Sequence, residues 1–287
     1  MSTRERRERS NESDRFLSQL FHDAAHLHGG ANWGKELALT AVGGYGRGEL
    51  SPGSDLDILF IHSGKVPAEL LKAFVNGLLY PLWDKKSVDH SVRTRGETRE
   101  AASSDLRVAT GLLDIRWIAG NVDLVASVQL DALDSWRKNS KQNLADLQKN
   151  LIERHARAGE LAYLLEPDLK EARGGLRDIQ ALRAISLSAV VPVPLEKISW
   201  AEGTLNNVRE SLHIASGRGK DRLLFQEQDK VAALLEYPDA DAMMSDVARA
   251  ARSVDYLLDY TWHWLEHKGK DGLGRILKRP RITTVAK

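Results

Sequence analysis

Two aspartates separated by a single residue, Asp55 and Asp57, have the spacing of paired metal ligands. They stand in the run DLDILFI, which favours a strand, and alternate side chains of a strand point to the same face. Aspartate is a poor strand former and neighbouring carboxylates repel each other, so a cation that prefers oxygen ligands, such as Mg²⁺, would stabilise the pair. The alternative is that Asp55 caps the turn after Ser54 and Asp57 is solvated at a sheet edge.

A glycine pair, Gly43 and Gly44, follows the apolar run of residues 37–42 and precedes the aspartates. A short helix beginning there would present backbone N–H groups and its positive end to a polyphosphate, and glycine would let the phosphate approach the main chain. The run GGYGRG fits neither the Walker A nor the Rossmann spacing, and alone it is more often a plain turn. Together, the glycines and Asp-x-Asp predict a triphosphate site and a metal site at one end of one sheet.

A third carboxylate, Asp89, lies on the next predicted strand, residues 87–93, and is expected beside the pair. Its predicted role is metal ligand and general base, taking the proton from a hydroxyl that attacks the α-phosphorus of a nucleotide in line. The alternative is an ordinary solvated aspartate on a strand.

Three basic residues, Lys170, Arg173 and Arg177, surround the break Gly174-Gly175 just before a predicted helix. Such a turn suits a second cradle for the triphosphate or the ribose, and its cations would hold the leaving pyrophosphate. The alternative is a corner between two helices with solvated charges. Asp178, inside the same stretch, either binds Arg173 or caps the helix.

The periodicity predicts an α+β protein, in which a small mixed sheet is followed by an α-helical bundle. Strands are expected at residues 37–42, 55–61 and 87–93, and almost no strand signal follows residue 96. Helices are expected near residues 13–28, 67–83, 97–119, 121–136, 140–165, 176–190, 202–214, 219–235 and 242–267. We therefore divide the chain into a disordered N-terminus (1–12), a nucleotidyltransferase domain (13–120), a helical domain (121–268) and a tail (269–287).

The composition excludes several classes of protein. With 41 Lys and Arg against 40 Asp and Glu among 287 residues, no charge excess indicates a nucleic-acid or membrane partner. The chain has no cysteine, which excludes disulfides, thiolate zinc sites and a cysteine nucleophile. No stretch approaches the roughly 20 apolar residues of a membrane span, and no signal peptide is visible, so we expect a cytoplasmic protein.

Four segments resemble the bacterial PII uridylyltransferase/uridylyl-removing enzymes, members of the polymerase-β-like nucleotidyltransferase superfamily. They are AVGGYGRGELSPGSDLDILF at 41–60, DHSVRT at 89–94, DLRVATGLLDIRWIAG at 105–120 and YLLEPDLKEARGGLRDIQALR at 163–183. The resemblance implies that Gly43, Gly44, Asp55 and Asp57 form the nucleotidyltransferase motif, and it favours a functional role for the basic turn. We include Arg47 and Ser54, from the first segment, among the expected nucleotide contacts.

The resemblance implies transfer of UMP from UTP, or of AMP from ATP, to a tyrosine of the PII nitrogen-signalling protein, with Mg²⁺ or Mn²⁺ as cofactor. Members of that family continue into a phosphohydrolase domain and two glutamine-sensing domains, and no His…His-Asp…Asp constellation follows residue 190 here. We therefore expect a truncated chain that transfers nucleotide without removing it. The alternatives are a catalytically silent nucleotide- or protein-binding fragment and an enzyme like the glutamine synthetase adenylyltransferases.

Overall fold

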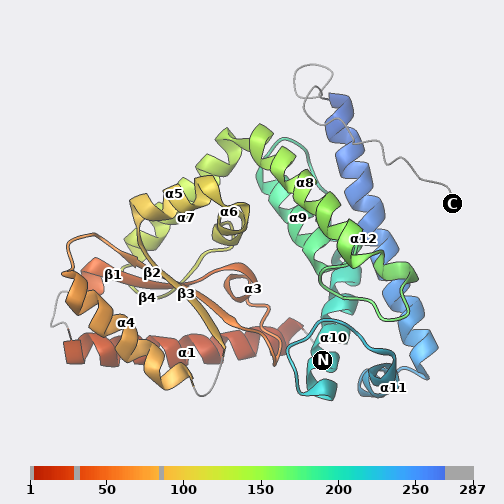
Figure 1. Ribbon diagram of the computed structural model, residues 1–287, viewed down its shortest axis with the longest axis horizontal. Helices are drawn as coiled ribbons and strands as arrows, with labels where there is room; N and C mark the ends of the chain where they lie inside the picture. The colour runs from red at the N-terminus through yellow and green to blue at the C-terminus, as the bar shows by residue number, and fades with distance from the viewer. Residues whose placement is uncertain (1–2, 29–32, 84–86, 269–287) are drawn as a thin grey trace.

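The computed structural model describes residues 3–28, 33–83 and 87–268 and divides them between a sheet region and a helical region (Figure 1). The sheet has four strands, β1 (Leu37–Ala41), β2 (Leu56–His62), β3 (Val88–Thr94) and β4 (Arg116–Gly120), in the order β3-β2-β1-β4. β1 is antiparallel to β2 and β4, whereas β2 and β3 are parallel. The predicted α+β class with a small mixed sheet is therefore confirmed.

Helices cover both faces of this sheet (Figure 1). On one side lie α1 (Thr3–His28), α2 (Trp33–Glu36) and α4 (Ala68–Trp83); on the other lie α5 (Arg95–Ser104), α6 (Leu106–Leu112) and α7 (Val122–Lys138). Leu56, Ile58 and Phe60, which alternate along β2, pack into the core beneath α1 and α4. Leu59 and Ile61 are buried in a second cluster on the opposite face. By alternation along β2, Asp57 shares that second face with them.

The parallel pairing of β2 and β3 needs a crossover connection, and α4 supplies it. The register places Asp57 opposite Asp89 and Phe60 opposite Val92. This pairing fixes which polar residues of the two strands can act together.

The helical region is a bundle with one apolar core. Its elements are α8 (Ser140–Ala158), η1 (Leu161–Tyr163), α9 (Leu176–Leu187), η2 (Leu195–Ile198), α10 (Ser199–Ser216), α11 (Phe225–Leu234) and α12 (Ala240–Lys268). Trp136 at the end of α7 is buried in this core and donates a hydrogen bond to the carbonyl oxygen of Ala184 at 2.8 Å, so α7 joins the two regions. Within the described ranges, every helix is too short or too polar to cross a membrane.

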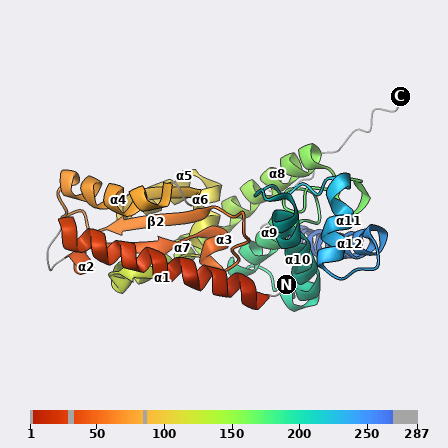
Figure 2. The ribbon, with the colours of Figure 1, turned by 90° about the horizontal axis from the view of Figure 1, so that it is seen from below.

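The prediction of a disordered N-terminus is wrong for residues 3–12, which belong to α1. Ser13, where the predicted helix begins, is buried within α1. The guanidinium groups of Arg6 and Arg9 bind the buried carboxylate of Glu210 on α10, at 3.1 and 2.7 Å. Figure 2 shows α1 running along the sheet region until it reaches α10. The charged run is helical because its arginines pair with a carboxylate that lies about 200 residues away in the sequence.

The predicted helix at residues 97–119 is also wrong. Asp105 accepts a hydrogen bond from the backbone N–H of Arg107, which starts α6 as a separate helix. The chain then forms β4, where Ile118 and Ala119 are buried against the sheet and Ala119 pairs with Leu39. A strand of five residues is too short to show a clear alternation. Three other helices are clearly shorter than predicted: α8 ends at Ala158, α9 ends at Leu187 and α11 begins at Phe225.

Candidate functional site

The three predicted carboxylates lie at one end of β2 and β3. Asp55 directly precedes β2, Asp57 is its second residue, and Asp89 is the Cα partner of Asp57 across the parallel ladder. Burial raises the pKa of Asp57, and the negative charges of Asp89 and Asp55 raise it further. The three acidic groups therefore act on one another electrostatically, while Asp55 and Asp89 are exposed to solvent.

The glycine pair lies against the same carboxylate. β1 ends at Ala41, and the short helix α3 (Gly43–Gly46) begins with Gly43 at a φ of +56°, where glycine is favoured. The backbone N–H of Val42 donates to the carbonyl oxygen of Asp57 at 3.0 Å. A Cβ built on Gly43 would lie 3.5 Å from Oδ2 of Asp57. The structure thus brings the start of the glycine-led turn next to the acidic pair, as the sequence predicted.

The chemistry of this donor set fits a hard divalent cation. Three carboxylates supply the oxygen ligands that Mg²⁺ and Mn²⁺ prefer. Within the described residues, however, the acidic and histidine side chains include no set of three arranged to hold a metal ion by themselves. Mg²⁺ commonly keeps water ligands and binds through one or two carboxylates together with substrate phosphates. The residues therefore fit an ion shared with a triphosphate, and the metal-binding role of Asp55, Asp57 and Asp89 stays a prediction.

Two cations of the helical region approach these carboxylates. The positive charges of Lys170 and Arg177 act to lower the pKa of Asp57. Burial and the acidic neighbours have larger effects, so the pKa of Asp57 is still raised overall. Arg177 forms an ion pair with Glu171 at 3.1 Å and is 45% exposed, so its guanidinium remains accessible to a ligand. The segment around the start of α9 thus carries two positively charged side chains, Lys170 and Arg177, that act on the acidic end of the sheet.

The backbone of this turn is not the helix-end cradle that we predicted. The N–H groups of Leu176 and Arg177 at the start of α9 donate to the carbonyl oxygens of Leu169 and Lys170, both at 3.0 Å. A Cβ on Gly174 would lie 2.6 Å from the carbonyl oxygen of Ala251, so glycine is required there for close packing against α12. The side chains of Lys170 and Arg177, rather than these amides, are left to contact an anion.

Asp178 does not bind Arg173, which was one of its two predicted roles. It is fully buried and accepts hydrogen bonds from Arg154, from His155 at 2.9 Å and from the N–H of Gly174 at 2.6 Å. Burial alone would raise its pKa, but these donors and the charge of Arg154 outweigh it and lower the pKa. This bond joins the carboxylate to the turn before α9, but α9 has no side-chain hydrogen bond at its N-cap, Gly175, so the capping alternative is not confirmed.

Arg173 points to a different part of the molecule. Its Nε lies 2.6 Å from Asp255 and its Nη2 lies 2.9 Å from Asp259, both on α12. These ion pairs attach the turn to α12. A role of Arg173 in binding phosphate stays a prediction that these contacts do not favour.

Arg47 and Ser54 also have structural partners. The guanidinium of Arg47 is largely buried between Glu49, at 2.8 Å, and Asp114, at 2.5 Å. The hydroxyl of Ser54 accepts a hydrogen bond from the N–H of Ser51 at 3.1 Å and closes the turn before Asp55. Both residues shape the backbone around the site, and their contact with a nucleotide stays a prediction.

Comparison with known proteins agrees with this geometry. Residues 31–133 match the family model of the nucleotidyltransferase domain, and residues 142–190 and 188–262 match the GlnD PII-uridylyltransferase model. The bifunctional uridylyltransferase/uridylyl-removing enzyme of Streptomyces coelicolor is 46% identical over 275 residues, covering 94% of this chain and 31% of that protein. The chain belongs to the PII-uridylyltransferase family.

Other members of this family are similar over a smaller part of the chain. The enzyme of the same name from Mycobacterium tuberculosis is 40% identical over 229 residues, which cover 77% of this chain and 28% of that protein. That of Azotobacter vinelandii is 40% identical over 228 residues, which cover 73% of this chain and 25% of that protein. The chain thus spans about a third or less of the length of these relatives. These matches do not favour the glutamine synthetase adenylyltransferase alternative.

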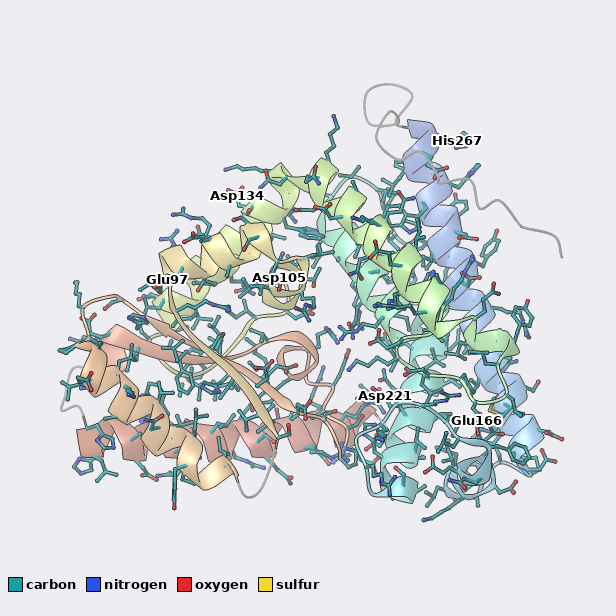
Figure 3. The ribbon with its side chains drawn as sticks, viewed as in Figure 1. Glu97, Asp105, Asp134, Glu166, Asp221 and His267 are labelled. Atoms are coloured by element: carbon teal, nitrogen blue, oxygen red, sulfur yellow. The ribbon has the colours of Figure 1, made fainter. Side chains whose placement is uncertain are left out.

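The structure adds residues that the sequence did not single out. Asp221, in the loop between α10 and α11, lies where the two regions of the chain meet (Figure 3). Its neighbour Arg209 on α10 donates a hydrogen bond to Ser51, just before the acidic pair. The four segments quoted for the family resemblance do not include residues 209–221, and only the glycines of the run GRGKD indicate a tight turn there.

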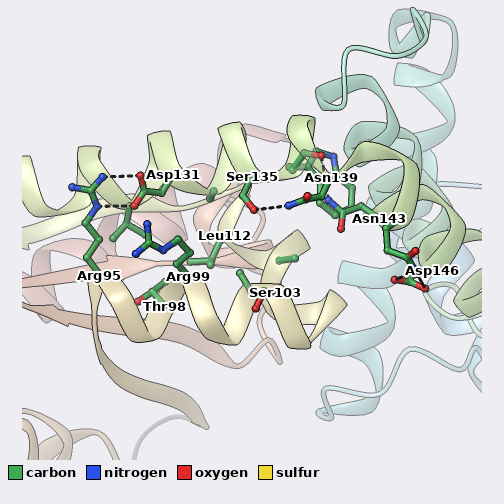
Figure 4. A pocket seen from close by; sticks show the side chains of 16 residues that line it. Arg95, Thr98, Arg99, Ser103, Leu112, Asp131, Ser135, Asn139, Asn143 and Asp146 are labelled. Atoms are coloured by element: carbon green, nitrogen blue, oxygen red, sulfur yellow. Dashed lines mark hydrogen bonds and ion pairs between the residues drawn. The ribbon is translucent and has the colours of Figure 1, made fainter.

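A separate pocket of about 300 Å³ lies between α5, α6, α7 and α8 (Figure 4). Arg95 and Asp131 form a bidentate ion pair at one end of it, and Asn139 and Asn143 line the other. Its lining includes none of the predicted site residues. We therefore assign the pocket no part in the chemistry of the acidic site.

Proposed function

We propose that this chain transfers a nucleoside monophosphate from UTP or ATP to a tyrosine hydroxyl of the PII nitrogen-signalling protein, releasing pyrophosphate, and that it does so in the cytoplasm. The observation that carries the proposal is the pairing of Asp57 with Asp89 beside Gly43, in a chain whose first region matches a nucleotidyltransferase domain. The names of the relatives support uridylyl transfer in particular.

The residues have distinct roles in this reaction. Asp55 and Asp57 would hold a Mg²⁺ ion together with the triphosphate, and the ion would supply charge neutralisation at the phosphate oxygens. Asp89 is exposed and accepts the proton of the attacking tyrosine hydroxyl. The phenolic oxygen forms a bond to the α-phosphorus as the bond from that phosphorus to the bridging oxygen breaks.

The leaving pyrophosphate takes up the electron pair of that broken bond and carries additional negative charge. Lys170 and Arg177, which act electrostatically on Asp57, are in position to bind it. The glycine at position 43 leaves room for the phosphate beside the main chain. We expect no nucleic acid and no membrane among the partners.

The proposal is tested by incubating the chain with purified PII, Mg²⁺ and either labelled UTP or labelled ATP, and measuring the mass of PII. An increase of one UMP or one AMP on a tyrosine supports the proposal and identifies the donor. Asp57→Asn should abolish labelling, whereas Asp134→Asn, on the exposed surface of α7, should not. If neither donor labels PII but the chain binds nucleotide, the silent binding fragment is favoured. Labelling of glutamine synthetase instead of PII would contradict the proposed acceptor.

A further inference from the structure

Asp221 is the centre of a cluster of cations in the helical region. One carboxylate oxygen, Oδ1, lies 2.6 Å from Nε of Arg209 and 2.9 Å from Nε2 of His213. The other, Oδ2, lies 3.7 Å from Nζ of Lys170. Burial alone would raise the pKa of Asp221, but the hydrogen bond from His213 and the charges of Arg209 and Lys170 outweigh it and lower the pKa to about 2. The carboxylate is therefore a fixed negative charge.

His213 helps to fix the orientation of this carboxylate. Its side chain is fully buried, and Nδ1 has no hydrogen-bond partner in the described part of the chain. Because Nε2 faces Asp221, we place a ring proton on this nitrogen. The histidine donates to the carboxylate from a side chain that packing prevents from turning.

The same cluster is attached to the loop that carries the metal-binding acids. Arg209, whose Nε binds Asp221, uses Nη1 to donate to the hydroxyl of Ser51 at 2.9 Å. Ser51 begins the turn that leads to Asp55. Beside this bond the two loops touch through their backbones: a Cβ on Gly219 would lie only 2.1 Å from the carbonyl oxygen of Gly53. The helical region is thus docked directly onto the approach to the acidic pair.

Lys170 lies where the two regions meet. Its ammonium group pairs with Asp221, whose partner Arg209 binds Ser51 in the loop before Asp55. At 3.7 Å from Asp221 it forms an ion pair longer than a hydrogen bond, and it is 32% exposed. The ammonium group therefore keeps N–H donors for an incoming anion.

We propose that Asp221 is a positioning residue that holds Lys170 beside the carboxylates and, through Arg209 and Ser51, ties this cation to the loop before Asp55. A subsite for the β- and γ-phosphates is then complete only when the helical region is docked on the sheet region. This inference rests on the proposed nucleotidyl transfer, and it adds a residue whose effect is exerted through Lys170 rather than by contact with the substrate.

The kinetic test uses Asp221→Asn, which keeps the shape of the side chain but removes its charge. Lys170 would contact the same phosphates in the bound triphosphate and in the leaving pyrophosphate, so misplacing it raises KM for the nucleotide and also lowers kcat. We expect KM to rise about tenfold, which corresponds to about 1.4 kcal/mol, with a smaller fall in kcat. Lys170→Met should have a similar effect, and the double variant should be no worse than Lys170→Met alone. Asp229→Asn, an exposed aspartate on α11, is the matched control.

A merely structural role gives a different result. The fraction of folded enzyme would then fall, so kcat would drop while KM stayed constant, and the effects of Asp221→Asn and Lys170→Met would add. Either pattern overturns the proposal. Circular dichroism at the assay temperature establishes that each variant is folded before its kinetics are compared.

A second measurement uses the unaltered chain and needs no PII. Lys170 is labelled with an amine-acylating reagent in the presence and absence of inorganic triphosphate and Mg²⁺, and the modified lysines are identified by mass spectrometry. We expect triphosphate to protect Lys170 and to leave Lys230, on the exposed surface of α11, reactive. Equal acylation of Lys170 in both samples overturns the inference even if PII is labelled. Protection without labelling of PII would instead retain the inference and refute the proposed acceptor.

Discussion

Replacing Gly43 with alanine tests whether the glycine-led turn and Asp57 form one site. The added methyl group would lie 3.5 Å from Oδ2 of Asp57, an ordinary contact, so the structural cost comes from the φ of +56°. A left-handed conformation costs a residue other than glycine roughly 1–2 kcal/mol. At about 2–4 °C for each kcal/mol in a protein of this size, the thermal midpoint should fall by about 2–8 °C.

The effect on activity should be much larger than this loss of stability. A magnesium ion binds its oxygen ligands at about 2.0–2.1 Å, so a methyl group beside Oδ2 occupies space that the ion's other ligands need. Displacing the reacting groups by about 1 Å can lower the rate roughly 100-fold. We therefore expect Gly43→Ala to lose about 100-fold or more in kcat/KM for the nucleotide while it stays folded.

Gly64→Ala is the matched control for this experiment. Gly64 follows the far end of β2, has a φ of +83°, and a Cβ there would meet only the methyl group of Thr94 at 3.7 Å. It should show the same loss in thermal midpoint by scanning calorimetry and nearly full transfer activity. If Gly43→Ala and Gly64→Ala keep equal activity at equal stability, Gly43 is a turn residue and the reasoning is refuted.

Three further predictions concern charge. In the absence of metal, Asp57→Asn should raise the thermal midpoint at pH 7 relative to Asp134→Asn, because the raised pKa of Asp57 means that its ionised carboxylate destabilises the folded chain. The gain should vanish below about pH 4, where this carboxyl group is protonated in both the folded and the unfolded chain, and a lower midpoint at pH 7 would refute the reasoning. Glu210→Ala should lower the free energy of unfolding in urea by about 3–5 kcal/mol, because it leaves the buried charge of Arg6 without its carboxylate partner; an unchanged urea midpoint would show that α1 does not depend on this pair. The ionised Asp221 should contribute about 2–3 kcal/mol that is present above about pH 4 and lost toward pH 2, so Asp221→Asn should flatten acid unfolding in that range.

The acidic site was predictable because its residues are close in sequence. The spacing of Asp55 and Asp57 fixes their common face, and only the short helix α3 and one turn separate Gly43 from Asp55. Asp89 needed one long-range assumption, that the next predicted strand lies beside the strand of the acidic pair, and β3 does pair with β2. Short-range patterns therefore sufficed for Asp55, Asp57 and Gly43 but not for Asp89.

The contacts between the two regions could not be predicted in this way. Arg6 forms an ion pair with Glu210, which lies some 200 residues further along the chain. Arg173 pairs with Asp255 and Asp259, although the sequence predicted a phosphate as its partner. A charged residue in isolation gives no indication of which distant opposite charge will bind it. The same limit explains why residues 3–12 were taken for a disordered segment and why Asp221 was overlooked.

The central claim is that Asp57 and its acidic neighbours hold a divalent ion together with a triphosphate. It is tested most directly by electron paramagnetic resonance of Mn²⁺, titrated with the chain in the presence of a nucleoside triphosphate analogue that cannot be cleaved at the α-phosphorus. We predict saturable binding to the unaltered chain and to Asp134→Asn, with binding lost in a folded Asp57→Asn variant. Equal Mn²⁺ binding by Asp57→Asn would contradict the account.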